Sequence, residues 1–160
     1  MTKAVFLKVL LFIGVLFTLS CSSENTGEIA SLNSVNDIKL ETQVIQLVNS
    51  HRESLGLKQL ILNAVAYNYA NEHNDYMIAK GSLSHDNFNS RASKISSETN
   101  AKEVGENVAK DYSTAKAVFD GWINSPLHKE NIESDFTHTG LSVKKDANGN
   151  FYFTHIFFKQ

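Results

Sequence analysis

Three residues of this sequence, His85, Glu106 and His128, have side chains that can bind a metal or transfer a proton, and their sequence context is compatible with a functional site. His85 stands in the polar segment Ser-His-Asp-Asn (84–87), and His128 closely follows the only proline of the chain. Glu106 follows a glycine within a short, largely apolar stretch, 104–109. A neutral imidazole is a common metal ligand, and a carboxylate can orient an imidazole or act as a general base.

Three kinds of site are compatible with this trio. In the first, His85 and His128 bind a divalent metal such as zinc and Glu106 orients one of them, with water completing a weakly held shell. In the second, Glu106 and a histidine serve as base and orienter in a hydrolysis. In the third, the trio is a structural polar network at the bottom of a binding cleft. The sequence contains no Gly-x-Ser-x-Gly and no His-Glu-x-x-His motif that would favour the hydrolase.

The other four histidines are expected to have structural or surface roles. His51 falls at the end of an expected helix, where an imidazolium interacts favourably with the helix dipole. His73 lies within another expected helix, His138 near the start of a strand, and His155 in an aromatic strand.

Composition excludes several classes of protein. The chain has 160 residues, 42% of them hydrophobic and 20% charged, which is typical of one globular domain with appendages. The formal net charge is −2, so there is no basic excess to neutralise phosphates, and we expect no nucleic-acid partner. A single cysteine rules out an intrachain disulfide and any multi-cysteine zinc site.

The N-terminus is typical of a secretory signal. Lys3 and Lys8 precede the apolar run 9–17, which is too short to span a bilayer comfortably. The following Thr-Leu-Ser-Cys, which ends at Cys21, resembles a bacterial lipobox, in which the signal is cut before the cysteine and the thiol receives a lipid. A plain secretory signal with an incidental cysteine is the alternative.

This N-terminus predicts three parts of the chain and a location. Residues 1–20 form a lipoprotein signal peptide, 21–37 hold the lipidated Cys21 and a polar, flexible tether, and 38–160 form the folded domain. The protein is then extracytoplasmic in a bacterial cell envelope, and a lipid anchor attaches it to the membrane.

Apolar periodicity predicts three clear helices in the folded part. The first covers about 38–55, and the second begins after Asn63 and ends at Gly81. Ser113 is expected to cap the third, whose apolar face includes a buried Trp122. Pro126 either ends that helix or opens a short next one, and 91–96 is expected to form at most one short helix.

The C-terminal region changes from helical to strand periodicity. Leu141 and Val143 alternate with polar residues, and 146–150 is a turn signal. Both faces of the strand 151–158 are strongly apolar, so it is expected to be central and covered on both sides. Together these elements predict an α+β fold, a three-layer α-β-α sandwich with a central antiparallel sheet.

The order of short motifs resembles the CAP superfamily in its short bacterial form. This superfamily, also called SCP, includes cysteine-rich secretory proteins, antigen 5 and pathogenesis-related 1 proteins. The resemblance extends from about residue 41 to the C-terminus and rests on several motifs in order: Leu47-Val48-Asn49-x-x-Arg52, Gly56-Leu57, Ser84-His85, Gly105-Glu106-Asn107-Val108-Ala109, Trp122-x-x-Ser125-x-x-His128-x-x-Asn131-Ile132, Phe136-Thr-x-x-Gly140 and Tyr152-Phe153-Thr154.

The resemblance implies an α-β-α sandwich with an open cleft that carries two histidines and two acidic residues. Some members bind a divalent metal through the histidines, and some bind sterols or fatty acids. By match, the cleft residues here are His85, Glu106 and His128, with the two histidines as metal ligands. Ser125 stands at about the position of the second acid, and the nearby Asp86 and Glu130 do not match the motif.

The expected function is therefore that of a lipid-anchored CAP-domain protein whose His/Glu cleft binds a small molecule, a lipid or a divalent metal. A hydrolase acting on peptide or cell-envelope material is one alternative, and an adhesion or host-interaction module is another. Because Ser125 replaces the second acid, binding is favoured over catalysis. The sequence leaves the ligand, the catalytic residues and the oligomeric state open.

Overall fold

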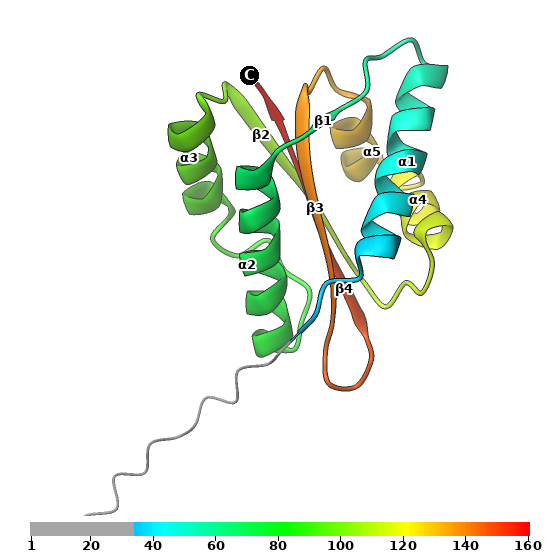
Figure 1. Cartoon of the computed structure of the whole chain (residues 1–160), viewed down its shortest axis with the longest axis vertical. Coiled ribbons are helices and arrows are strands. Elements are labelled where there is room, and N and C mark those ends of the chain that lie inside the picture. The colour runs from blue at the N-terminus through cyan, green and yellow to red at the C-terminus, as the bar shows by residue number, and fades with distance from the viewer. Residues whose placement is uncertain (1–33) are drawn as a thin grey trace, which may run out of the picture. The chain divides into compact units, whose positions relative to one another are not determined.

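Residues 34–160 are described by a computed structural model, and Figure 1 shows their arrangement. This part of the chain contains five helices and four strands. Their bounds, in chain order, are α1 Ile38–Ser54, β1 Ile61–Leu62, α2 Ala64–Lys80, α3 Phe88–Thr99, β2 Glu103–Lys110, α4 Ala115–Ile123, α5 Pro126–Glu133, β3 His138–Lys145 and β4 Phe151–Lys159.

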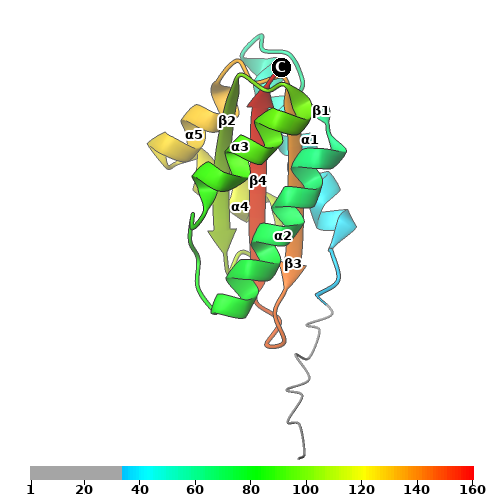
Figure 2. The ribbon, with the colours of Figure 1, turned by 90° about the vertical axis from the view of Figure 1, so that its left-hand side faces the viewer.

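The four strands form one sheet in the order β1-β3-β4-β2 (Figure 2). Strand β4 is antiparallel to both of its neighbours, β3 and β2, as expected for a central strand. Strand β1 differs from the expected antiparallel pattern, because it pairs in parallel with β3. It reaches only two residues of β3, so most of the outer edge of β3 has no strand beside it.

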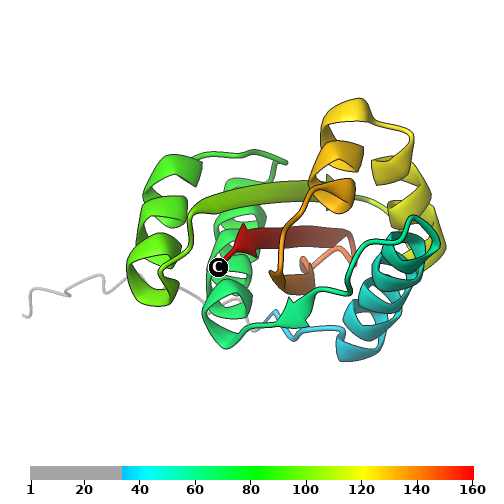
Figure 3. The ribbon, with the colours of Figure 1, turned by 90° about the horizontal axis from the view of Figure 1, so that it is seen from above.

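Helices cover both faces of the sheet, which confirms the three-layer α+β sandwich. Helices α2 and α3 lie on one face, and α1, α4 and α5 lie on the other (Figure 3). One apolar core, which includes Trp122, Phe153 and Phe157, fills the space beneath α1, α4 and α5. A second, smaller core that includes Ile95 and Ile156 lies beneath α2 and α3. The side chain of Trp122 is buried, as predicted.

The helices described here begin and end at residues that are typical of helix caps. The side chain of Asn63 accepts hydrogen bonds from the first turn of α2, and Gly81 ends that helix in the left-handed conformation, with φ 74°. The cap of α4 is Thr114 rather than the expected Ser113, because the hydroxyl of Thr114 accepts a bond from the backbone N–H of Ala117. Pro126 opens α5 at its first turn, where its missing N–H costs nothing.

Two elements differ from the sequence expectation. Helix α3 spans 12 residues, longer than the short helix expected at 91–96. Segment 103–110, for which the sequence pattern predicts no secondary structure, forms edge strand β2. Gly105, Glu106 and Asn107 interrupt its apolar residues, so strand periodicity is weak there. Pairing with the aromatic β4 over the whole length of β2 determines its conformation instead.

The N-terminal predictions fall mostly outside the described residues. This applies to the signal peptide 1–20, to lipidated Cys21 and to the tether as far as residue 33. The last residues assigned to the tether contact the domain: Asn36 bridges to Lys144, and Asp37 caps α1. Among the helices of residues 34–160, none has the length and apolar character needed to cross a membrane.

Candidate functional site

Glu106 of β2 is a buried carboxylate held by an arginine from a neighbouring helix. Arg91 of α3 donates from Nε to Oε2 at 2.8 Å and from Nη2 to Oε1 at 2.8 Å. Both side chains are almost inaccessible, with 8% of Arg91 and 1% of Glu106 exposed. Such a two-point pairing fixes both the position and the plane of the carboxylate.

His85 is the second partner of this carboxylate. Its Nδ1 lies 2.9 Å from Oε1 of Glu106. Because an ionised carboxylate only accepts hydrogen bonds, Nδ1 carries the proton of this bond, and Nε2 makes no bond to a described residue. The side chain of His85 is 51% exposed, so a ligand from solvent can reach it. A carboxylate that orients an imidazole in this way is typical of the surroundings of metal-binding histidines.

His73 of α2 completes the surroundings of Glu106. It is buried, and its Nε2 donates to the carbonyl oxygen of Ser84 at 2.8 Å. The same nitrogen lies 3.8 Å from Oε1 of Glu106. Since Ser84 directly precedes His85, the bond from His73 fixes the loop that presents His85. The structural role expected for His73 is thus a positioning role within the site.

The charges around Glu106 keep it ionised. Burial alone would raise the pKa of this carboxyl, but the hydrogen bond from His85 and the charge of Arg91 outweigh burial and lower the pKa below its usual value. Burial lowers the pKa of His73 despite the nearby Glu106. The network at neutral pH therefore consists of an arginine cation, a carboxylate and a neutral His73.

His128 lies on α5, beside β2. Its Nδ1 is 2.9 Å from the hydroxyl oxygen of Ser125, which leaves Nε2 without a bond to any described residue. The backbone carbonyl of His128 accepts a bond from Nδ2 of Asn107 at 2.9 Å. Burial, and secondly the charge of His85, lower the pKa of His128. His128 is accordingly neutral at physiological pH, the form in which imidazole binds metals.

Two asparagines and a glycine hold α5 against β2. Asn131 donates to the backbone oxygen of Glu106 at 3.3 Å and to the side chain of Asn107 at 2.8 Å, so both asparagine side chains bond to groups between α5 and β2. A Cβ atom on Gly105 would lie 2.6 Å from Oδ1 of Asn131. Glycine at this position thus permits the close approach that brings His128 to the strand of Glu106.

The structure brings the predicted residues into one region but supplies few ligands. Glu106 contacts His85 directly, and Asn107 connects β2 to His128. Across residues 34–160, no group of three or more His, Cys, Asp or Glu side chains is arranged to hold a metal ion. Nε2 of His85 and Nε2 of His128 are the ring nitrogens of the predicted pair that make no hydrogen bond to a described residue.

Neither nearby acid replaces the absent second acid. Asp86 is engaged by Lys80 and accepts a hydrogen bond from the hydroxyl of Tyr76 at 2.7 Å. Its pKa falls to about 2, because these hydrogen bonds stabilise the carboxylate. Glu130 is exposed on α5. Ser125, at the position of the acid, instead pairs with His128.

Sequence reasoning missed Arg91, and it missed the part that His73 plays in the site. Arg91 lies in a segment rich in Ser, Asn and Lys, where a single arginine carries no signal of its own. Its significance depends on α3 crossing β2, which no local pattern reveals. The one available signal was the need of a buried Glu106 for a cationic partner.

Comparison with known proteins places the chain in a family. The family model described as "CAP: Cysteine-rich secretory protein family" matches residues 45–157, which is most of the chain. The chain belongs to the CAP family. The match contains the three predicted residues, His85, Glu106 and His128, together with strands β1, β2 and β3 and most of β4.

Two relatives of similar sequence come from Bacillus subtilis. The uncharacterised membrane protein YlbC is 28% identical over 145 residues, which cover 84% of this chain and 40% of YlbC. The uncharacterised protein YkwD is 31% identical over 105 residues, which cover 63% of this chain and 41% of YkwD. The chain thus spans about two fifths of the length of each curated relative.

Solved structures confirm the CAP fold. An outer surface protein from Borrelia burgdorferi superposes with a TM-score of 0.72 at 20% identity, covering 79% of this chain and 97% of that one. An extracellular protein containing an SCP domain from Bacillus anthracis superposes with a TM-score of 0.66 at 23% identity, covering 77% of this chain and 41% of that one. A cysteine-rich secretory protein from Staphylococcus aureus superposes with a TM-score of 0.67 at 18% identity, covering 77% of this chain and 39% of that one.

Proposed function

We propose that this CAP-family chain is a lipid-anchored, extracytoplasmic binding protein that holds a divalent metal such as zinc in a cleft between His85 and His128. The observation that carries the proposal is the bond from Nδ1 of His85 to Glu106, because it leaves Nε2 of His85 free and directs the ring. A carboxylate bonded to the far nitrogen also raises the basicity of the ligating nitrogen.

His128 supports the same proposal from the other side. Its Nδ1 is occupied by Ser125, so Nε2 is again the available nitrogen. Its lowered pKa keeps the ring neutral without competition from protons near pH 7. Two imidazole ligands make a weak, open site, in which water completes the coordination shell.

A bound metal would act as a Lewis acid and would leave coordination positions open to a small ligand. In this arrangement Arg91 keeps Glu106 ionised, Glu106 directs His85, and His73 holds the loop of His85 through Ser84. The chain itself thus contributes a prepared first ligand, His85, and a neutral second ligand, His128.

Calorimetric titration with zinc at pH 7.5 tests the metal proposal. We expect saturable binding by the wild-type protein, loss of most binding in His85→Ala and in His128→Ala, and a loss of roughly 10–100-fold in Glu106→Gln. His51→Ala is the matched control, because His51 lies on α1 and pairs with Glu133, and it should bind like the wild type. Binding that survives both His85→Ala and His128→Ala would place the metal elsewhere.

The lipid anchor rests on the N-terminal sequence. Lys3 and Lys8, the apolar run and the single Cys21 support processing before Cys21 and acylation of its thiol. Labelled palmitate fed to expressing bacteria should enter the wild-type protein and not Cys21→Ser. Equal labelling of the two proteins would refute the anchor.

Hydrolysis is the second candidate function, and one contact favours it. The hydroxyl oxygen of Ser125 lies 2.9 Å from Nδ1 of His128, the separation expected of a nucleophile and its general base. No described side chain bonds to Nε2 of His128 to orient it, so the pair lacks the third member of a triad. A fluorophosphonate probe would label Ser125 if the hydrolase were correct, and His128→Ala would abolish that labelling.

A further inference from the structure

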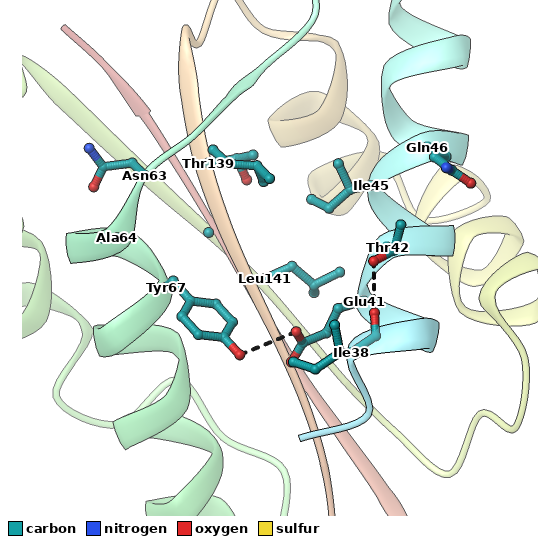
Figure 4. A pocket seen from close by; sticks show the side chains of 12 residues that line it. Ile38, Glu41, Thr42, Ile45, Gln46, Asn63, Ala64, Tyr67, Thr139 and Leu141 are labelled. Atoms are coloured by element: carbon teal, nitrogen blue, oxygen red, sulfur yellow. Dashed lines mark hydrogen bonds between the residues drawn. The ribbon is translucent and has the colours of Figure 1, made fainter. Parts of the chain in front are cut away.

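A cavity lies at the edge of the sheet, and none of His85, Glu106 and His128 lines it. It has a volume of about 420 Å³ and opens between α1 and α2 above strand β3 (Figure 4). Its walls combine apolar and polar side chains, namely those of Ile38, Glu41, Thr42, Ile45, Gln46, Leu62, Asn63, Ala64, Tyr67, Thr139 and Leu141, with Gly140 in its floor.

The floor of this cavity is a gap in the pairing of β3. On one side of the gap, the backbone N–H of Asn63 donates to the carbonyl of Thr139 at 2.8 Å. On the other side of the gap, the backbone N–H and C=O of Val143 both point to the outer edge of β3. The N–H donates to Oε1 of Glu41, and the C=O accepts from the backbone N–H of Asp37, each at 2.9 Å.

Leu141 lies between these two positions. Because backbone groups of a strand face the same edge at every second residue, the N–H and C=O of Leu141 also point outward. No described residue pairs with them on that edge, where β1 has already ended. One hydrogen-bond donor and one acceptor are therefore directed at the cavity, and buried backbone groups of this kind normally have partners.

The cavity also contains a buried carboxylate. Glu41 is only 7% exposed, and its Oε2 receives one long bond, 3.3 Å, from the hydroxyl of Tyr67, as drawn in Figure 4. Burial raises the pKa of Glu41, and the negative charge of Asp37 adds to this effect. Within residues 34–160 no salt bridge includes Glu41, so its charge lacks a cation.

The cavity is bordered by closely packed backbone at Gly140 and by exposed apolar side chains near its opening. A Cβ atom on Gly140 would lie 2.2 Å from the backbone nitrogen of Tyr67, so glycine allows α2 to rest directly on β3. The side chains of Ile38 and Leu62 are 58% and 68% exposed at either side. Exposed apolar side chains around a preformed cavity are typical of a ligand site.

We propose that this cavity binds a primary ammonium group attached to a small apolar body, with the ammonium against Glu41 and the apolar part against Ile38, Ile45 and Leu62. Two sources carry this chemistry: a simple hydrophobic amine, and the N-terminal residue of an apolar peptide. A peptide N-terminus would in addition place its first amide beside the outward N–H and C=O of Leu141.

Titration of the isotope-labelled full chain by NMR tests this site with three probes. Leucinamide has the ammonium, the amide and the apolar chain, isoamylamine lacks the amide, and N-acetylleucinamide lacks the ammonium. We expect leucinamide to shift the backbone signals of Leu141 and Tyr67 saturably and N-acetylleucinamide to bind at least about tenfold more weakly, the scale of one lost charge-assisted bond. Tighter binding of leucinamide than of isoamylamine identifies a peptide N-terminus, and equal binding identifies a simple amine.

Two variants with matched controls complete the test. Glu41→Gln should weaken leucinamide binding about tenfold or more, whereas Glu53→Gln, an exposed change on the same helix, should not. Ala64→Phe, at the exposed rim, should block the cavity without disturbing the core, and Ala79→Phe on the exposed side of α2 is its control. The proposal is wrong if leucinamide leaves Leu141 unshifted, if N-acetylleucinamide binds equally well, or if Ala64→Phe binds like the wild type.

Discussion

The guanidinium of Arg91 and the carboxylate of Glu106 form a buried two-point ion pair, with both hydrogen bonds at 2.8 Å. One oxygen of the same carboxylate also accepts the bond from His85. Arg91 therefore acts on His85 through Glu106: it holds the carboxylate in the plane that the imidazole requires. The pair connects α3 to β2 and links the stability of the fold to the geometry of the site.

Arg91→Ala should destabilise the protein by about 3–5 kcal/mol, because it leaves the buried carboxylate of Glu106 without its cation. Urea denaturation measures the loss. Lys116→Ala is a suitable control, because Lys116 forms an exposed ion pair with Asp120 and its removal should have little effect. The double variant Arg91→Ala, Glu106→Gln should recover part of the loss, and a loss below ~1 kcal/mol in Arg91→Ala would contradict the account.

His155 should make the protein sensitive to acid. Its ring is completely buried beside Trp122 and Phe157, and neither ring nitrogen has a partner among the described residues. Burial, together with the charge of Arg52, lowers the pKa of His155 from 6.5 to about 3. The unfolded chain therefore binds a proton below pH 6.5 that the folded protein excludes, and stability falls as the pH drops from about 6.5 towards 3.

The change His155→Phe measures this contribution. At pH 5 the wild type should lose roughly 2 kcal/mol through His155, since one pKa unit corresponds to about 1.4 kcal/mol. The free energy of unfolding of the variant should still fall as the pH drops, but less steeply, because His73 and His128 also have lowered pKa values. Urea denaturation from pH 7.5 to pH 4.5 gives the slope of the unfolding free energy against pH for the wild type and for the variant. Equal slopes for the two proteins would show that His155 does not titrate as described.

Trp122→Ala should cost about 3–5 kcal/mol, as for other large aromatic side chains removed from a core. Trp122 is 2% exposed, packs edge-on against Phe153 and donates from Nε1 to the carbonyl of Val108 at 3.3 Å. Chemical denaturation followed by circular dichroism determines the loss. A cost under ~1 kcal/mol would mean that Trp122 is accessible in solution, which its burial excludes.

The parts of the fold that follow from local chemistry were predictable. Asn63 and Gly81 mark the ends of α2 because a side-chain cap and a left-handed glycine act within one turn of the helix. Strand β4 was recognisable as central because both of its faces are apolar. The cap of α4 was misplaced by one residue, since Ser113 and Thr114 are both good caps and only the backbone conformation distinguishes them.

The candidate site was predictable in its residues but not in its connections. Motif order indicated His85, Glu106 and His128, whereas Arg91 reaches Glu106 only because α3 packs beside β2. The cavity near Glu41 gave no sequence signal either. Glu41 lies on a predicted helix like any exposed acid, and its partner, the backbone N–H of Val143, is 102 residues away.

Nε2 of His85 and Nε2 of His128 are the proposed metal-binding atoms, and long-range ¹H–¹⁵N NMR of the histidine side chains observes each ring nitrogen separately. Without metal, His85 should show the tautomer with the proton on Nδ1, because that nitrogen donates to Glu106. Added zinc should shift Nε2 of both His85 and His128 and leave His73 and His155 unchanged. A proton on Nε2 of His85 in the metal-free protein, or zinc-induced shifts confined to other histidines, would contradict the account.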